Sequence, residues 1–144
     1  NYLNINLDNT NQIVAGASMG GLMSMKTSIL FPQFRNIISL SPAFWFGYPS
    51  VLHDIKNLSN ESSTYLYTGK KEGHIFGDHV KNIFPNNWDL DFSNNDDFYY
   101  SGVKNIKDSF DSNNKKVIFS FQDNGRHNET SWATAILEIL GKLI

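Results

Sequence analysis

Four short apolar runs, rich in β-branched and aromatic residues, recur along this 144-residue chain and limit the folds open to it. They occupy residues 12–17, 36–40, 64–67 and 116–121. Their centres, such as Val117-Ile118-Phe119, are apolar without interruption, whereas half-exposed antiparallel strands alternate apolar with polar residues. We therefore expect four buried strands that run parallel to one another.

Helical patterns separate these strands. They are predicted over residues 20–31, 49–58, 97–112 and 129–143. Pro32 ends the first helix, because proline disfavours helical dihedral angles in the residue before it. In the last helix, Trp132, Ile136 and Leu140 recur at four-residue spacing and form an apolar stripe that faces a core. Strands that alternate with helices predict an α/β fold with a mainly parallel sheet.

The composition excludes several classes of function. The net charge is −2 and the only arginines are Arg35 and Arg126, so a basic surface for nucleic acid or anionic lipid is not expected. No apolar run is long enough to span a bilayer. The chain has no cysteine, which excludes disulfides, thiol nucleophiles and cysteine-ligated zinc. We therefore expect no nucleic-acid partner and no membrane partner.

The first predicted strand leads directly into Gly16-Ala17-Ser18-Met19-Gly20, which has the pattern G-x-S-x-G. Between a strand and a helix, this pattern is typical of a nucleophile elbow, a strained turn that exposes the serine hydroxyl. Side chains at the two flanking glycines are expected to collide with the neighbouring strand and helix. The N–H of Met19 would point at a developing oxyanion. The alternative is that these small residues only allow the strand and helix to pack tightly.

A nucleophilic serine needs a base, and the chain has four histidines. His53 falls in a predicted helix, and His74 and His79 lie in an irregular segment at a spacing that does not suit a helical metal pair. His127 follows the fourth predicted strand in a loop. In α/β sheets, the loops at the carboxyl ends of parallel strands carry the functional residues. We expect His127 to be the base; the alternative is a loop histidine without a role.

The base in turn needs a carboxylate that orients it. Glu72 comes just after the third predicted strand, at the same edge of the sheet as Ser18 and His127. The chain order Ser18, Glu72, His127 is that of the α/β-hydrolase triad. Asp78, six residues further on, is the competing carboxylate.

The chain resembles the esterase-D-like, or "putative esterase", family of α/β-hydrolases, which includes enterochelin-type siderophore esterases and feruloyl and acetyl-xylan esterases. The stretches that carry this resemblance lie between residues 15 and 132 and read AGASMGGLMSM, ISLSPAFWF, YTGKKEG and HNETSW. The resemblance implies that Ser18 is the nucleophile, His127 the base and Glu72 the acid. It also implies that Phe44 and Trp45 lie beside an acyl or alcohol pocket, although both aromatic residues could equally be core packing.

The sequence thus predicts a serine esterase that cleaves carboxylic esters through an acyl-enzyme, with Met19 supplying one oxyanion donor. A small-molecule ester is the expected partner, and no cofactor or metal is expected. The acidic stretch from Asp89 lacks the glycine and the bidentate glutamate of a calcium loop. The alternatives are a peptidase or acyltransferase on the same scaffold, or a domain that binds without catalysis.

Two features depart from the family pattern. Residues 73–100 form a long irregular segment, rich in Asn and Asp, which we interpret as an insertion that acts as a lid or an ornament. The family also places several strands before the elbow strand, and with them the loop that supplies a second oxyanion N–H. Residues 1–144 are therefore expected to be the C-terminal half of an α/β-hydrolase domain, which a companion chain or segment completes.

Overall fold

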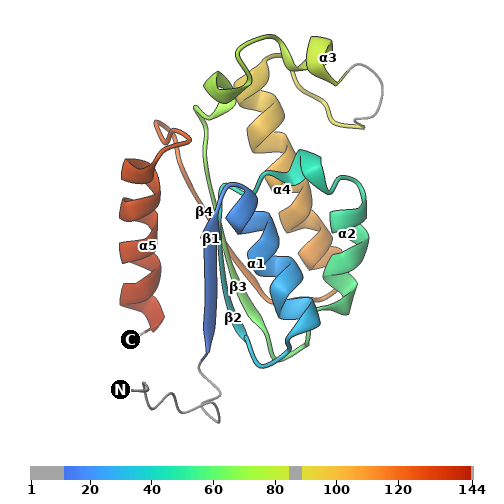
Figure 1. Ribbon diagram of the computed structural model, residues 1–144, viewed down its shortest axis with the longest axis vertical. Helices are drawn as coiled ribbons and strands as arrows, with labels where there is room; N and C mark the ends of the chain where they lie inside the picture. Colours follow the sequence, from blue (N-terminus) through green and yellow to red (C-terminus); the bar gives the residue numbers. More distant parts are fainter. Residues whose placement is uncertain (1–11, 85–88, 144) are drawn as a thin grey trace, which may run out of the picture.

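The computed structural model describes residues 12–84 and 89–143, and residues 1–11, 85–88 and 144 lie outside the described part (Figure 1). Its centre is a sheet in which every pair of neighbouring strands is parallel. The strands, in their spatial order, are β1 (Ile13–Ala17), β2 (Asn36–Leu40), β3 (Ser63–Gly69) and β4 (Val117–Gln122). This arrangement confirms the predicted α/β class with a parallel sheet and is consistent with half of an α/β fold.

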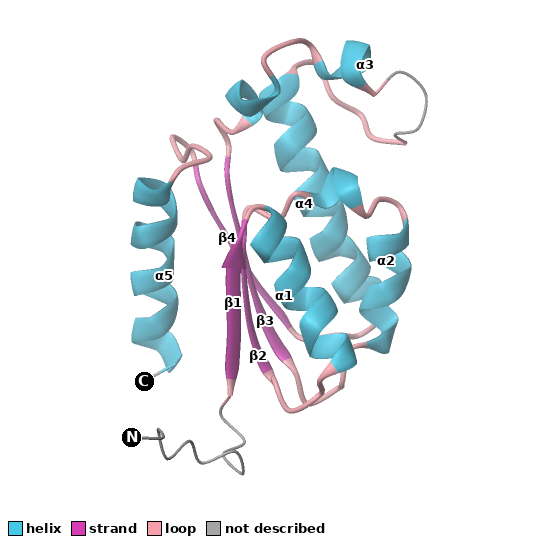
Figure 2. Cartoon of the chain, in the orientation of Figure 1, coloured by secondary structure: helices cyan, strands magenta, loops and turns pink. Residues whose placement is uncertain are grey.

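Helices cover both faces of this sheet. In Figure 2, α1, α2 and α4 lie on one side of the strands and α5 lies on the other. The helices are α1 (Met19–Leu30), α2 (Ser50–Asp54), α3 (Val80–Ile83), α4 (Asn95–Ser112) and α5 (Glu129–Leu143). None of the helices in the described part of the chain has the length and apolar character that crossing a membrane requires.

Two cores explain why the inner strands are buried on both faces. Ile37 of β2 packs in a cluster with residues of α1 and α4, whereas its neighbour Ile38 packs with Ala135 and Ile139 of α5. Successive side chains of a strand point to opposite faces, so a strand with a helix layer on each side buries every residue. All seven residues of β3 are accordingly buried.

The outer strands differ from the prediction of four buried strands. Ile13 of β1 is 42% exposed and Ile118 of β4 is 38% exposed. Both lie at the edges of the described sheet, whereas the buried residues that pack against α5 come from the central strands β2 and β3. Edge position, which the apolar pattern of a single strand does not encode, accounts for the difference.

The register of the strands brings their carboxyl ends to one edge of the sheet. Ala17 of β1 pairs with Leu40 of β2, which pairs with Tyr67 of β3, which in turn pairs with Ser120 of β4. The loops that follow the four strands therefore meet at this edge. They carry Ser18, Ser41, Glu72 and His127.

Two predicted segments need correction. The helix predicted over residues 49–58 is the short helix α2 followed by a 3₁₀ turn, Ile55–Asn57. The irregular segment 73–100 contains the 3₁₀ turn Gly73–Phe76, α3 and the first residues of α4. Val80, Phe98 and Tyr99 are fully buried in the main core, so this segment is part of the domain's packing as well as a surface loop.

Candidate active site

Ser18 occupies a strained turn between β1 and α1. Its φ is 56° and its ψ is −121°, in a region that residues other than glycine rarely adopt. The turn is fastened to the loop after β2, because the Ser18 N–H donates to the carbonyl of Leu40 at 2.9 Å and the Ser18 carbonyl accepts from the N–H of Ala43 at 3.0 Å. These bonds hold the serine in the geometry of a nucleophile elbow.

The steric demand around Ser18 falls on Gly16 and Gly21. A Cβ on Gly16 would lie 2.2 Å from the carbonyl oxygen of Gly20, and a Cβ on Gly21 would lie 2.7 Å from that of Leu40. A Cβ on Gly20 would meet nothing within 4 Å. The prediction of a steric demand holds for Gly16 and is wrong for Gly20, whose backbone, not its missing side chain, makes the close approach.

His127 lies in the loop between β4 and α5, and its ring reaches Ser18. The Nε2 atom is 2.9 Å from the Ser18 Oγ. The ring centroid lies 4.9 Å from that of Trp132, edge to face, and 5.3 Å from that of Tyr99. These two aromatic side chains limit the rotation of the imidazole, and neither was predicted as a site residue.

Glu72 is fully buried and binds the other ring nitrogen of His127. Its Oε2 is 2.8 Å from the His127 Nδ1, and its Oε1 accepts from the Ser41 hydroxyl at 2.7 Å and from the N–H of Gly69. A carboxyl group out of contact with water needs such donors to offset the loss of hydration. With Nδ1–H donating to Glu72, Nε2 is left to accept the Ser18 hydroxyl proton.

Close backbone packing brings the loops after β3 and β4 together. The N–H of Lys71 donates to the carbonyl of Gly125 at 2.9 Å. A Cβ on Gly69 would lie 2.2 Å from that same carbonyl oxygen. This approach sets the residues that follow shortly in each loop, Glu72 and His127, within hydrogen-bonding distance of each other.

Asp78, the competing carboxylate, does not bind His127. It is exposed, and its carboxylate accepts hydrogen bonds from the N–H of His79 and from the side chain of Asn82. These bonds lower the pKa of Asp78 below its ordinary value. The geometry therefore selects Glu72 as the partner of His127.

Ser41 connects the surrounding side chains to Glu72. Its hydroxyl, which donates to Glu72, accepts from the Trp132 Nε1–H at 3.0 Å. Its carbonyl accepts from the Tyr99 hydroxyl at 2.7 Å. Ser41 is fully buried and has a positive φ of 43°. The sequence patterns do not predict Ser41 as a site residue, and the only sequence signal for it is its place directly after a predicted strand.

Two buried tyrosines near Glu72 stay protonated. Burial, followed by the negative charge of Glu72, raises the pKa of Tyr67 to about 12. The same two causes raise the pKa of Tyr99 well above its ordinary value. The Tyr99 phenol is therefore a permanent hydrogen-bond donor to Ser41 at neutral pH.

The remaining predicted site residues are Met19, Phe44 and Trp45. Met19 is the first residue of α1, where backbone N–H groups have no intrahelical acceptor. Phe44 is fully buried and its ring packs against those of Phe98 and Tyr99, which favours core packing. Trp45 is half-buried, with its ring centroid 5.2 Å from that of Tyr99.

No protein-family model matches this chain, and no curated protein matches it. Within the described residues, no three His, Asp or Glu side chains are grouped so that they could hold a metal ion.

Proposed function

We propose that this chain is a serine hydrolase that cleaves carboxylic esters, and that it belongs to the esterase-D-like family of α/β-hydrolases. One observation carries the proposal: a continuous hydrogen-bonded series from the Ser18 hydroxyl through both nitrogens of His127 to the buried Glu72. A serine in a strained strand-to-helix turn, with a base and an oriented carboxylate, is the arrangement that acyl transfer requires.

In the proposed reaction, the Ser18 Oγ attacks the ester carbonyl carbon while its proton passes to the His127 Nε2. The negative charge that develops on the carbonyl oxygen is stabilised by the Met19 N–H at the N-terminus of α1. The C–O bond to the alcohol then breaks, and Nε2 returns the proton to the departing oxygen. Water attacks the acyl-enzyme by the reverse sequence and releases the acid. Glu72 holds the imidazole in the required tautomer and stabilises its charged form.

Labelling with a fluorophosphonate probe, which forms a covalent bond only with an activated serine, tests the proposal. The wild-type chain is expected to be labelled, and Ser18→Ala is expected to lose the label while it keeps its fold by circular dichroism. Ser50→Ala is the matched control, because Ser50 is exposed and its hydroxyl binds the Gly47 carbonyl in its own turn. Labelling that persists in Ser18→Ala, or an unlabelled wild-type chain, would contradict the proposal.

A substrate panel separates esterase from the related activities. Esters of p-nitrophenol with short acyl chains, feruloyl sugars and peptide amides differ only in acyl group, alcohol or leaving group. We expect hydrolysis of esters and not of amides. Preferential transfer to an added alcohol would instead indicate an acyltransferase.

We also propose that a companion segment completes the site at β1. Within the described residues β1 pairs only with β2, so its other edge, near the exposed Ile13, has no partner strand there, and folded proteins normally pair or cover such an edge. Without a second oxyanion donor the rate is expected to be about 10²–10³-fold lower. The test is to express residues 1–144 alone, measure the oligomeric state and assay a short-chain p-nitrophenyl ester. A fully active monomer would refute this part of the proposal.

A further inference from the structure

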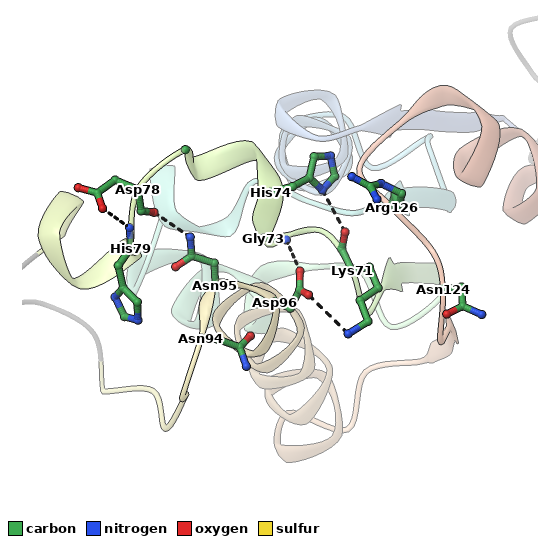
Figure 3. A pocket seen from close by; sticks show the side chains of 11 residues that line it. Lys71, Gly73, His74, Asp78, His79, Asn94, Asn95, Asp96, Asn124 and Arg126 are labelled. Carbon is green, nitrogen blue, oxygen red and sulfur yellow. Dashed lines mark hydrogen bonds and ion pairs between the residues drawn. The ribbon is translucent and has the colours of Figure 1, made fainter.

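A cleft of about 760 Å³ is lined by residues of the two loops that carry Glu72 and His127 (Figure 3). Lys71 and Gly73, the sequence neighbours of Glu72, line it, and so does Arg126, which directly precedes His127. Its walls come from the loops after β3 and β4 and from the start of α4. The cleft is thus formed by the same loops that carry the proposed acid and base.

Polar side chains line most of this cleft, and both of its carboxylates already have hydrogen-bond or ion-pair partners. The Asp96 carboxylate accepts from the N–H of Gly73 at 2.8 Å and lies 3.7 Å from the Lys71 Nζ. The Asp78 carboxylate binds the N–H of His79 and the Asn82 side chain. Neither acid needs the remaining cation of the cleft as a partner.

That cation is Arg126. It is exposed, and among the described residues its guanidinium makes no hydrogen bond or ion pair. His74 lines the same cleft, and its Nδ1 is 3.0 Å from the carbonyl of Lys71. Figure 3 shows the two side chains entering the cleft from the loops after β4 and β3. A guanidinium offers parallel N–H groups that match the two oxygens of a carboxylate.

The proposed reaction decides which part of the substrate meets this cleft. The His127 Nε2 must deliver its proton to the departing alcohol, so the alcohol lies on the histidine side of Ser18. The carbonyl oxygen lies on the other side, toward the Met19 N–H. Because Arg126, the residue next to His127, lines this cleft, the cleft is the candidate site for the alcohol part of the ester.

We propose that this cleft binds the alcohol part of the substrate and that Arg126 pairs with a carboxylate on that alcohol. The inference rests on the proposed function, because the proton that His127 delivers decides on which side of Ser18 the alcohol lies. A singly charged carboxylate suits the site better than a phosphate dianion, since Asp78 and Asp96 already place negative charge in the walls.

The test compares two esters that differ in one charge, 4-nitrophenyl acetate and 3-carboxy-4-nitrophenyl acetate. The measured quantity is the ratio of kcat/KM for the carboxylated ester to that for the neutral ester. In Arg126→Gln this ratio is expected to fall about 5- to 10-fold, as for a partly exposed charge-assisted pair. Arg35→Gln is the matched control. Arg35 is the only other arginine; it pairs with Glu61 at 2.8 Å and precedes β2, at the opposite edge of the sheet.

The outcomes separate this inference from the proposed function. Suppose that hydrolysis depends on Ser18 but the ratio of the two kcat/KM values is the same in the wild-type chain and in Arg126→Gln. This result would overturn the assignment of the cleft and would leave the esterase proposal standing. If neither ester is hydrolysed, the esterase proposal fails, and calorimetric binding of 3-hydroxybenzoate and phenol tests the cleft by itself. Weaker binding of 3-hydroxybenzoate in Arg126→Gln, with phenol unaffected, would support a carboxylate site; equal binding to both proteins would overturn it.

Discussion

Replacing Ser41 with alanine removes one hydroxyl from the interior and should affect both stability and turnover. The hydroxyl donates to the Oε1 of Glu72 at 2.7 Å and accepts from the Trp132 Nε1–H at 3.0 Å. Alanine keeps the Cβ, so the positive φ at this position is as costly in the variant as in the wild type. The effect therefore reports the two hydrogen bonds.

The size of the stability loss depends on how well the two groups that lose a hydrogen-bond partner are otherwise satisfied. A hydrogen bond to a charged group contributes about 1.5–3 kcal/mol to stability. Glu72 is fully buried and keeps its two other donors, Gly69 and His127, which places the loss near the middle of that range. Trp132 is only half-buried, so water replaces part of its lost bond. We expect a loss of about 2–3 kcal/mol in the free energy of unfolding.

Urea unfolding followed by tryptophan fluorescence measures this loss, and with an m-value of about 1.5 kcal/mol/M the midpoint should fall by about 1–2 M. A carboxylate held by two donors instead of three orients His127 less well, so kcat should fall about 10-fold. Fluorophosphonate labelling should slow in proportion.

Ser39→Ala is the matched control. Ser39 is also fully buried, but its hydroxyl donates at 2.8 Å to the neutral carbonyl of Gly21, which Ser24 binds as well. Its loss should cost about 1 kcal/mol and leave kcat unchanged. Equal effects of Ser41→Ala and Ser39→Ala on both stability and kcat would refute the argument that the Ser41 bond supports the charge of Glu72.

Further predictions concern the acid, the elbow glycines and alkaline stability. Glu72→Gln should lower kcat by about 10³–10⁴-fold, because the tautomer of the base is no longer controlled, whereas Asp78→Asn should not; near-normal turnover of Glu72→Gln would assign the role to another carboxylate. In urea unfolding, Gly16→Ala should lower the free energy of unfolding by about 3 kcal/mol or more, because its Cβ would lie 2.2 Å from a backbone oxygen. Gly20→Ala should raise the free energy of unfolding by about 0.5–1 kcal/mol. A similar change in both variants would contradict the steric explanation. The pKa of Tyr67, about 12, lies above its value of about 10 in an unfolded chain, so its contribution to stability is complete below pH 10 and is lost as the pH rises toward 12. Urea unfolding between about pH 9 and pH 12 should show this decline, and a decline just as steep in Tyr67→Phe would assign it to other groups.

The local pattern of the sequence predicted most of the secondary structure. The strand predicted over residues 36–40 and the helix predicted over residues 129–143 have the bounds that the structure shows. These segments are continuous patterns bounded by clear start and stop signals, so neighbouring residues alone specify them. The helix predicted over residues 49–58 is broken by a 3₁₀ turn, and the exposure of β1 and β4 depends on their edge positions. Both features depend on packing partners that are distant in the sequence.

The sequence by itself determined which residues lie at the edge of the sheet formed by the carboxyl ends of the strands. In a parallel sheet every strand ends at the same edge, so the positions of Ser18, Glu72 and His127 after three strands were enough to predict that they lie near one another. No knowledge of side-chain packing was needed for that step. It left open whether Glu72 or Asp78 binds the histidine.

Only the tertiary structure decided that choice and the rest of the site. Glu72 accepts a hydrogen bond from Ser41, which in turn binds Trp132 and Tyr99, and these contacts join segments that are far apart in the sequence. The Ser18–His127 bond itself spans 109 residues. Contacts of this kind depend on sub-ångström packing of whole elements, such as the approach of Gly69 to Gly125, which no local pattern of residues encodes.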